Sequence, residues 1–88
     1  MNTPLDTAYF SAVMVAGALE KDHNPLAADA RALKEAIARA LTHPEAMRTD
    51  EFKTIWNGRT RFSTLNLDGE TGDVITKHAT ILTQITLN

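Results

Sequence analysis

The spacing of apolar residues in the first part of the chain is helical. Residues 4–21 are apolar on almost every side of a helix, which is typical of a helix surrounded by other elements. Thr3 can cap the start of this helix, Pro4 suits its first position, and Asp6 favours the positive end of the helix dipole. The pattern therefore predicts a central helix over residues 4–21.

Two further helices are predicted in the middle of the chain. Residues 25–41 carry one narrow apolar stripe opposite a charged face, which indicates an amphipathic surface helix. Residues 49–57 also have helical spacing. Because Pro44 could start a helix as well as Thr49 could, one kinked helix and a turn followed by a short helix both fit. Phe52, Ile55 and Trp56 fall on one side of this segment. Trp56 faces the core or a partner, and we favour the core.

From residue 60 the periodicity changes to two, which predicts strands over residues 60–67 and 74–87 around a tight turn. With a three-residue loop at residues 70–72, one face of this hairpin is mostly apolar and the other is rich in threonine. A four-residue loop would split the apolar residues between the two faces. We therefore predict an antiparallel β-hairpin with the three-residue loop.

The second predicted strand is longer than the first, so residues 83–87 have no local partner. The backbone groups of a strand must meet another strand, end at an exposed edge, or turn over the helices. The predicted architecture is a single α+β domain over residues 1–88, in which an N-terminal layer of three helices packs on one face of the C-terminal hairpin. Dimerisation could extend the sheet, so we expect self-association as a homodimer.

The threonine-rich face of the predicted hairpin is a candidate binding surface. The register places Phe62 diagonally beside Leu82 on this face. Two large apolar side chains on a polar sheet face are either covered by another part of the chain or form the anchor of an interface. The hypothesis of a partner-binding patch includes the following residues: Phe62, Leu82, Thr80, Gln84 and Trp56.

Composition and charge limit the possible classes of protein. An 88-residue chain has room for one domain, and 43% hydrophobic with 23% charged residues is typical of a globular protein. The chain has no cysteine, its first ten residues hold an acid and no base, and the apolar run at residues 8–19 is too short for a membrane span. We therefore expect a soluble, cytoplasmic protein. The net charge of -2 gives no electrostatic reason to expect nucleic acid or an anionic membrane as partner.

No motif in the sequence indicates catalysis. His23, His43 and His78 lack the spacing of metal ligands. There is no cysteine nucleophile, no nucleophile elbow and no glycine-rich phosphate loop, and the acids at the predicted turn do not match a calcium loop. We expect no enzymatic activity, no cofactor and no metal site.

One basic cluster supports an alternative function. Arg48, Lys53, Arg59 and Arg61 lie near the third predicted helix and the hairpin, and three helices followed by a hairpin correspond loosely to a winged helix-turn-helix domain. The negative net charge disfavours this interpretation. We predict a small non-catalytic protein that acts by protein–protein binding, as a regulator, inhibitor or adaptor. The alternatives are a nucleic-acid-binding regulator and a structural component or accessory subunit of a larger assembly.

Overall fold

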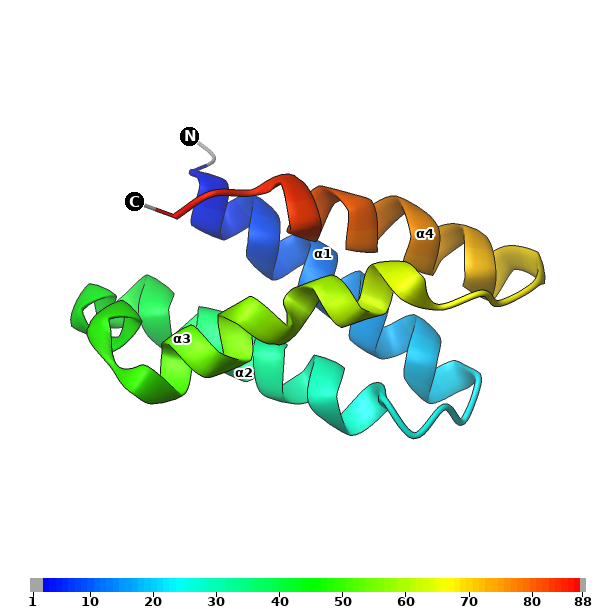
Figure 1. The fold of residues 1–88 in the computed structure, drawn as a ribbon, viewed down its shortest axis with the longest axis horizontal. Helices are drawn as coiled ribbons and strands as arrows, with labels where there is room; N and C mark the ends of the chain where they lie inside the picture. Colours follow the sequence, from blue (N-terminus) through cyan, green and yellow to red (C-terminus); the bar gives the residue numbers. More distant parts are fainter. Residues whose placement is uncertain (1–2, 88) are drawn as a thin grey trace.

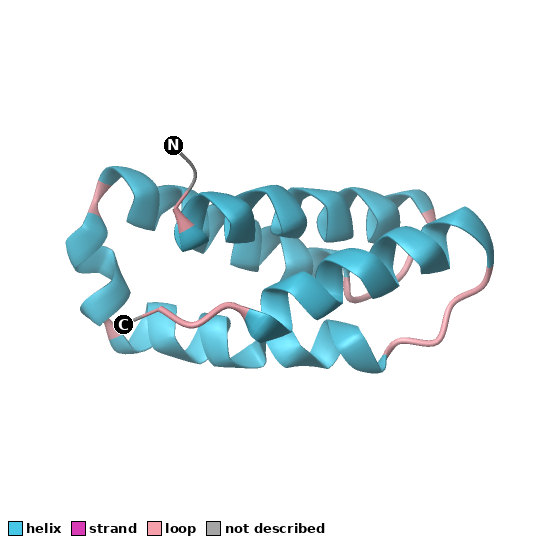
Figure 2. Cartoon of the chain, turned by 90° about the horizontal axis from the view of Figure 1, so that it is seen from above, coloured by secondary structure: helices cyan, strands magenta, loops and turns pink. Residues whose placement is uncertain are grey.

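The computed structural model describes residues 3–87, and all of its regular elements are helical (Figures 1 and 2). Helix α1 contacts both α2 and α4, while α3 and two short 3-10 segments connect α2 to α4. The two ends of the described chain lie at the same end of the molecule (Figure 1). In chain order the elements are α1 (Pro4–Lys21), α2 (Ala27–Thr42), η1 (Pro44–Arg48), α3 (Asp50–Asn57), η2 (Gly58–Thr64) and α4 (Gly69–Gln84).

Helix α1 is the central element, and it covers the residues that the pattern predicted. The Thr3 hydroxyl accepts a hydrogen bond from the Asp6 amide at 3.2 Å, and the Asp6 carboxylate accepts one from the Thr3 amide at 3.0 Å. The Thr3 hydroxyl also donates to this carboxylate at 2.7 Å, and the hydrogen bonds from the Thr3 amide and the Thr3 hydroxyl lower the pKa of Asp6. The buried side of α1 consists mostly of small residues, which lets α2 and α4 approach closely: Ala8, Ser11, Ala12, Val15, Ala16 and Leu19.

The middle of the chain contains a turn followed by a short helix, one of the two arrangements that the sequence left open. The Thr49 hydroxyl accepts a hydrogen bond from the Phe52 amide at 3.1 Å and so caps α3. Helix α2 begins at Ala27 rather than at residue 25. The delay has a local cause, because the Asn24 side chain accepts a hydrogen bond from the Leu26 amide at 2.9 Å in the turn before the helix.

The predicted C-terminal β-hairpin, and with it the α+β class, is wrong. Residues 60–67, expected as the first strand, lie largely in η2, and residues 74–87, expected as the second, lie largely in α4. Threonine, valine and isoleucine favour strands mainly through the packing of their side chains, so the packing of α4 on α1 overrides that preference. The residues that α4 buries follow helical spacing: Gly72, Ile75, His78, Ala79 and Leu82.

The predicted hairpin turn is the start of α4. Gly69 has a φ of 73°, a left-handed conformation that glycine adopts without steric cost. Glu70 lies in the first turn, where the helix dipole favours an acid. The Gly72 amide donates a hydrogen bond to the Asp68 carbonyl at 3.4 Å. Residues 70–72, assigned to a hairpin loop, therefore belong to the first turn of a helix.

The strand edge predicted at residues 83–87 is also wrong. Residues 83 and 84 complete α4, and residues 85–87 form an irregular tail that runs past the start of α1 (Figure 1). Because residues 3–87 contain no sheet, dimerisation cannot extend one there. Homodimer formation through another surface stays a prediction.

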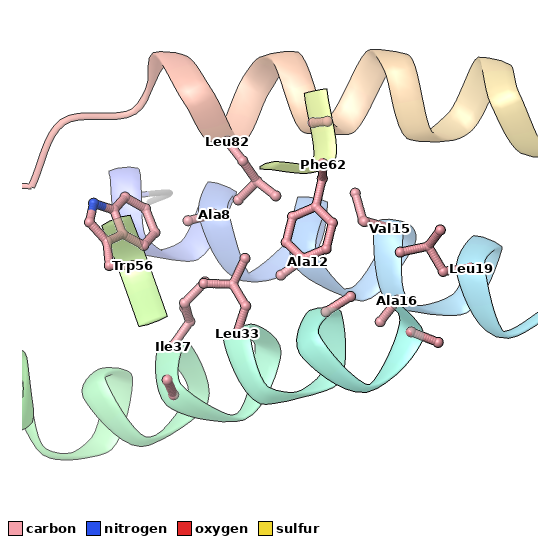
Figure 3. Packing of buried hydrophobic residues seen from close by; sticks show 14 of the residues in the cluster. Ala8, Ala12, Val15, Ala16, Leu19, Leu33, Ile37, Trp56, Phe62 and Leu82 are labelled. Atoms are coloured by element: carbon pink, nitrogen blue, oxygen red, sulfur yellow. The ribbon is translucent and has the colours of Figure 1, made fainter. Parts of the chain in front are cut away.

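Phe62 lies at the centre of the core. Its ring extends from η2 towards α1, beside Leu82 of α4, and Leu33 and Ile37 of α2 lie on the other side of the cluster (Figure 3). Only 2% of the surface of Phe62 and 0% of that of Leu82 are exposed. One shared apolar cluster therefore joins η2 and the three long helices, which is why this segment is helical despite its alternating pattern.

Candidate functional site

The candidate site is a groove at the end of the molecule where the two termini lie. It has a volume of about 910 Å³, which is within the range of ligand-binding sites in proteins. The first turn of α1, the segment η1, the outer side of α3 and the C-terminal tail form its walls. The lining residues are Thr3, Pro4, Leu5, Pro44, Glu45, Met47, Arg48, Phe52, Lys53, Trp56, Asn57, Thr86 and Leu87.

Two stacked aromatic rings support the groove. Phe52 and Trp56 are one turn apart on α3, with ring centroids 6.1 Å apart and an angle of 10° between the ring planes. Phe52 is 6% and Trp56 8% exposed, so both belong to the core and only a small part of each ring reaches the groove. Leu5, Met47 and Leu87 are half-buried and bring three further apolar side chains from three different segments. The wall of the groove is therefore mainly apolar.

Arg59 fixes the position of Trp56 relative to the tail. Its guanidinium donates hydrogen bonds to the carbonyls of Leu82 at 2.7 Å, of Ile85 at 3.0 Å and of Trp56 at 3.0 Å. It also lies 4.2 Å from the centroid of the Trp56 ring, in cation–π contact. Burial lowers the pKa of Arg59, but an arginine remains charged at neutral pH. Arg59 is thus a positioning residue that joins α3, α4 and the tail.

The rim of the groove carries two exposed cations. Within residues 3–87, the side chains of Arg48 and Lys53 have no ion-pair or hydrogen-bond partner. The acid on the rim, Glu45, is 3.6 Å from Nδ1 of His43. Positive charge therefore prevails around an apolar groove, although the whole chain has a net charge of -2.

The structure separates the residues of the predicted partner-binding patch. Phe62 and Leu82 cannot anchor a partner at the surface, because both are core residues. Thr80 and Gln84 are exposed on α4, and the Thr80 hydroxyl donates to the Thr76 carbonyl at 2.7 Å. Only Trp56 of the five lines the groove. The anchor on a sheet face is therefore wrong, since the pair that formed it is buried between helices.

The structure also divides the predicted basic cluster. Arg61 donates to Asp29 of α2 at 3.0 Å and to the Gly58 carbonyl at 3.0 Å, and Arg59 is held by three carbonyls. Two of the four cations thus have structural partners. Arg48 and Lys53 remain together on one rim, beside an apolar groove rather than along a basic stripe.

Sequence reasoning missed most of the groove. The spacing of Phe52 and Trp56 placed both on one side of a helix, which was a usable signal. Leu5 and Leu87 gave none, because they are 82 positions apart and meet only in the folded chain.

A second polar feature is buried between α1 and α4. The Ser11 hydroxyl lies 3.2 Å from Nδ1 of His78, and the Phe10 ring stands edge-on to the imidazole at 5.6 Å. Ser11 has 0% exposure, so no substrate can reach its hydroxyl. The pair satisfies two polar groups inside the helical layer, which is a structural role.

The buried imidazole makes the stability of the fold dependent on pH. Burial, with a smaller contribution from the charge of Lys77, lowers the pKa of His78 below its ordinary value of 6.5. The unfolded chain therefore binds this proton more readily than the folded protein does. We expect the free energy of unfolding to fall as the pH drops below about 6.5, until the folded-state pKa is passed.

Urea unfolding followed by circular dichroism at about pH 7.5 and about pH 5.5 measures this dependence. In the His78→Gln variant the difference in unfolding free energy between the two pH values should be smaller than in the wild type. An equal difference in both proteins would show that other groups cause the pH dependence.

Three further observations concern metal binding, membrane crossing and similarity to known proteins. Residues 3–87 contain no group of three or more histidine or acidic side chains that could hold a metal ion. None of the helices in the same range combines the length and apolar character needed to cross a membrane, and the cytoplasmic location stays a prediction. Comparisons of the chain with protein-family models, with curated proteins and with solved structures give no match.

Proposed function

We propose that this chain is a small non-catalytic protein that binds another protein through the groove between α1, η1, α3 and the tail. It would act as a regulator, an inhibitor or an adaptor. The observation that supports the proposal is a partly open, mainly apolar groove of about 910 Å³, on whose rim two cations have no partner within residues 3–87. An accessory subunit of an assembly would use the same groove and differ only in keeping its partner permanently.

The shape of the site favours a polypeptide segment over a small molecule. Small-molecule sites bury most of the ligand surface, whereas this groove is only partly enclosed and is lined by four chain segments. A helix or an extended segment can place side chains in such a groove and keep its other side in solvent. The fixed aromatic pair of Phe52 and Trp56 supplies the kind of preformed apolar contact that anchors a partner.

Selection from a random peptide library tests this proposal. Segments of about 12 residues are long enough for roughly three helical turns or one extended stretch. Enriched peptides should change the fluorescence of Trp56, the single tryptophan of the chain, which lines the groove. The variant Met47→Asp, which puts a charge into the apolar wall, should lose this binding.

The matched control for this variant is Met14→Asp. Met14 is also half-buried, but it lies on α1 outside the groove lining, so its replacement should leave peptide binding unchanged. Melting curves of both variants establish that they are folded. If no enriched peptide responds to Met47→Asp while the variant remains folded, the groove is not the binding site.

A further inference from the structure

The charges around the groove identify the chemistry of the partner segment. We infer that the groove receives an acidic amphipathic segment, whose apolar side chains lie against Phe52 and Trp56 and whose carboxylates pair with Arg48 and Lys53. This inference rests on the proposed function, because it specifies the occupant of the same groove.

Arg48 differs from every other arginine in the described chain. Arg31 pairs with Glu20 and Arg39 with Glu51, while Arg59 and Arg61 bind backbone carbonyls and an aspartate. Arg48 alone has no acceptor for its guanidinium within residues 3–87. A guanidinium presents a planar set of donors that matches a carboxylate, so it is suited to an acid supplied by a partner.

The order of residues on α3 defines the pattern that the partner must match. Phe52 and Trp56 form one row, and Lys53 and Asn57, each one position further along the chain, form a polar row beside it. The aromatic row forms part of the groove wall, whereas the Lys53 side chain is exposed. A complementary segment therefore has an apolar row flanked by acids, as an acidic amphipathic helix does.

Nearby carboxylates of the chain do not neutralise this rim. Glu45 is 3.6 Å from His43, and Glu51 of α3 is 3.6 Å from Arg39 of α2. Asp50 lies between the two cations in the sequence; it forms no ion pair within residues 3–87 and does not line the groove. The local field around the groove attracts an anionic segment and disfavours a basic one, which gives selectivity even where each exposed pair contributes little affinity.

Peptide selection with reversed rim charges tests the inference. The wild type should enrich peptides that combine at least two large apolar residues with a net negative charge. The double variant Arg48→Glu/Lys53→Glu should bind the best of these about tenfold more weakly, measured by Trp56 fluorescence, and should enrich neutral or basic peptides instead. The control Lys34→Glu/Lys77→Glu changes the net charge equally outside the groove lining and should bind within about twofold of the wild type.

Each outcome of this experiment decides a separate point. Peptides that bind at Trp56 without any preference for acids would overturn the inference and leave the proposed function standing. The absence of groove-binding peptides would overturn the proposed function, and the inference with it. Binding of a mixed-sequence DNA duplex that is saturable, weakens with salt and is lost in Arg48→Glu/Lys53→Glu would overturn both in favour of a nucleic-acid partner.

Discussion

Replacing both Phe62 and Leu82 with serine should unfold the protein. Both side chains are almost completely buried in the cluster that joins η2 to the long helices (Figure 3). Truncation of a buried phenylalanine costs about 3–5 kcal/mol and of a buried leucine about 2–5 kcal/mol, and each serine also leaves a hydroxyl in an apolar site. Because a small domain has only about 5–15 kcal/mol of stability, the double variant should lose its helical circular dichroism signal and its cooperative melting transition.

The single variant Phe62→Ala allows the loss of stability to be measured. It should remain folded in the absence of urea and lose about 3–5 kcal/mol in urea unfolding. Phe10→Ala is the matched control, because the Phe10 side chain is 57% exposed and contacts the His78 ring only by its edge. It should cost about 1 kcal/mol or less. A double serine variant that melts like the wild type would mean that both residues are at the surface, which is one of the two interpretations that the hairpin register left open.

The helices that sequence reasoning predicted correctly have signals at their first residues. In α1, Thr3, Pro4 and Asp6 mark the start, and the structure uses all three in the first turn. In α3, Thr49 caps the helix as one of the two interpretations required. Such signals act over a few residues, so they are read from the chain without knowledge of the fold.

The prediction for the C-terminal part of the chain failed because the local sequence pattern favours strands, whereas packing in the folded protein favours a helix. From residue 74 to residue 87 the apolar residues fit a period of two, but the buried residues Ile75, Ala79 and Leu82 also fit a helix. The helical arrangement of these residues is favoured only when another helix buries them. That helix is α1, which is distant in the sequence, so the local pattern does not reveal it. Threonine residues at other positions in this segment increased the apparent preference for strands, but they do not determine how the segment packs.

Of the residues that form the candidate groove, only the two aromatic residues and the two cations could be grouped from the sequence. Phe52 and Trp56 were placed on one face by their spacing, and Arg48 and Lys53 were recognised as neighbouring cations. That two of the four predicted cations have structural partners follows from contacts with Asp29 and with carbonyls of α4 and the tail. Such contacts depend on the packing of segments that are distant in sequence, which no local pattern contains.

Replacing Gly72 with alanine should destabilise the protein strongly, even though alanine is the better helix former. Gly72 is buried in the first turns of α4, and a Cβ atom at this position would collide with the backbone carbonyl of Leu67. A carbonyl of the main chain cannot rotate away as the end of a side chain can, so the segment before α4 must shift. We expect a loss of about 2–4 kcal/mol in the free energy of unfolding, measured in urea.

Gly17→Ala is the matched control, because the same substitution in α1 has the opposite expected sign. Gly17 is exposed within the helix, and a Cβ atom there meets nothing within 4 Å beyond the adjacent backbone of its own helix. The added methyl group restricts the unfolded chain and favours the helix, so stability should rise by about 0.5–1 kcal/mol.

If residues 70–72 formed a hairpin loop instead, Gly72 would have the left-handed conformation at the bulge, and Gly72→Ala would act through backbone strain. Gly72→Asn distinguishes the two cases, because asparagine tolerates that conformation but would collide with the Leu67 carbonyl as alanine does. An asparagine variant markedly more stable than the alanine variant would therefore contradict the helical start of α4.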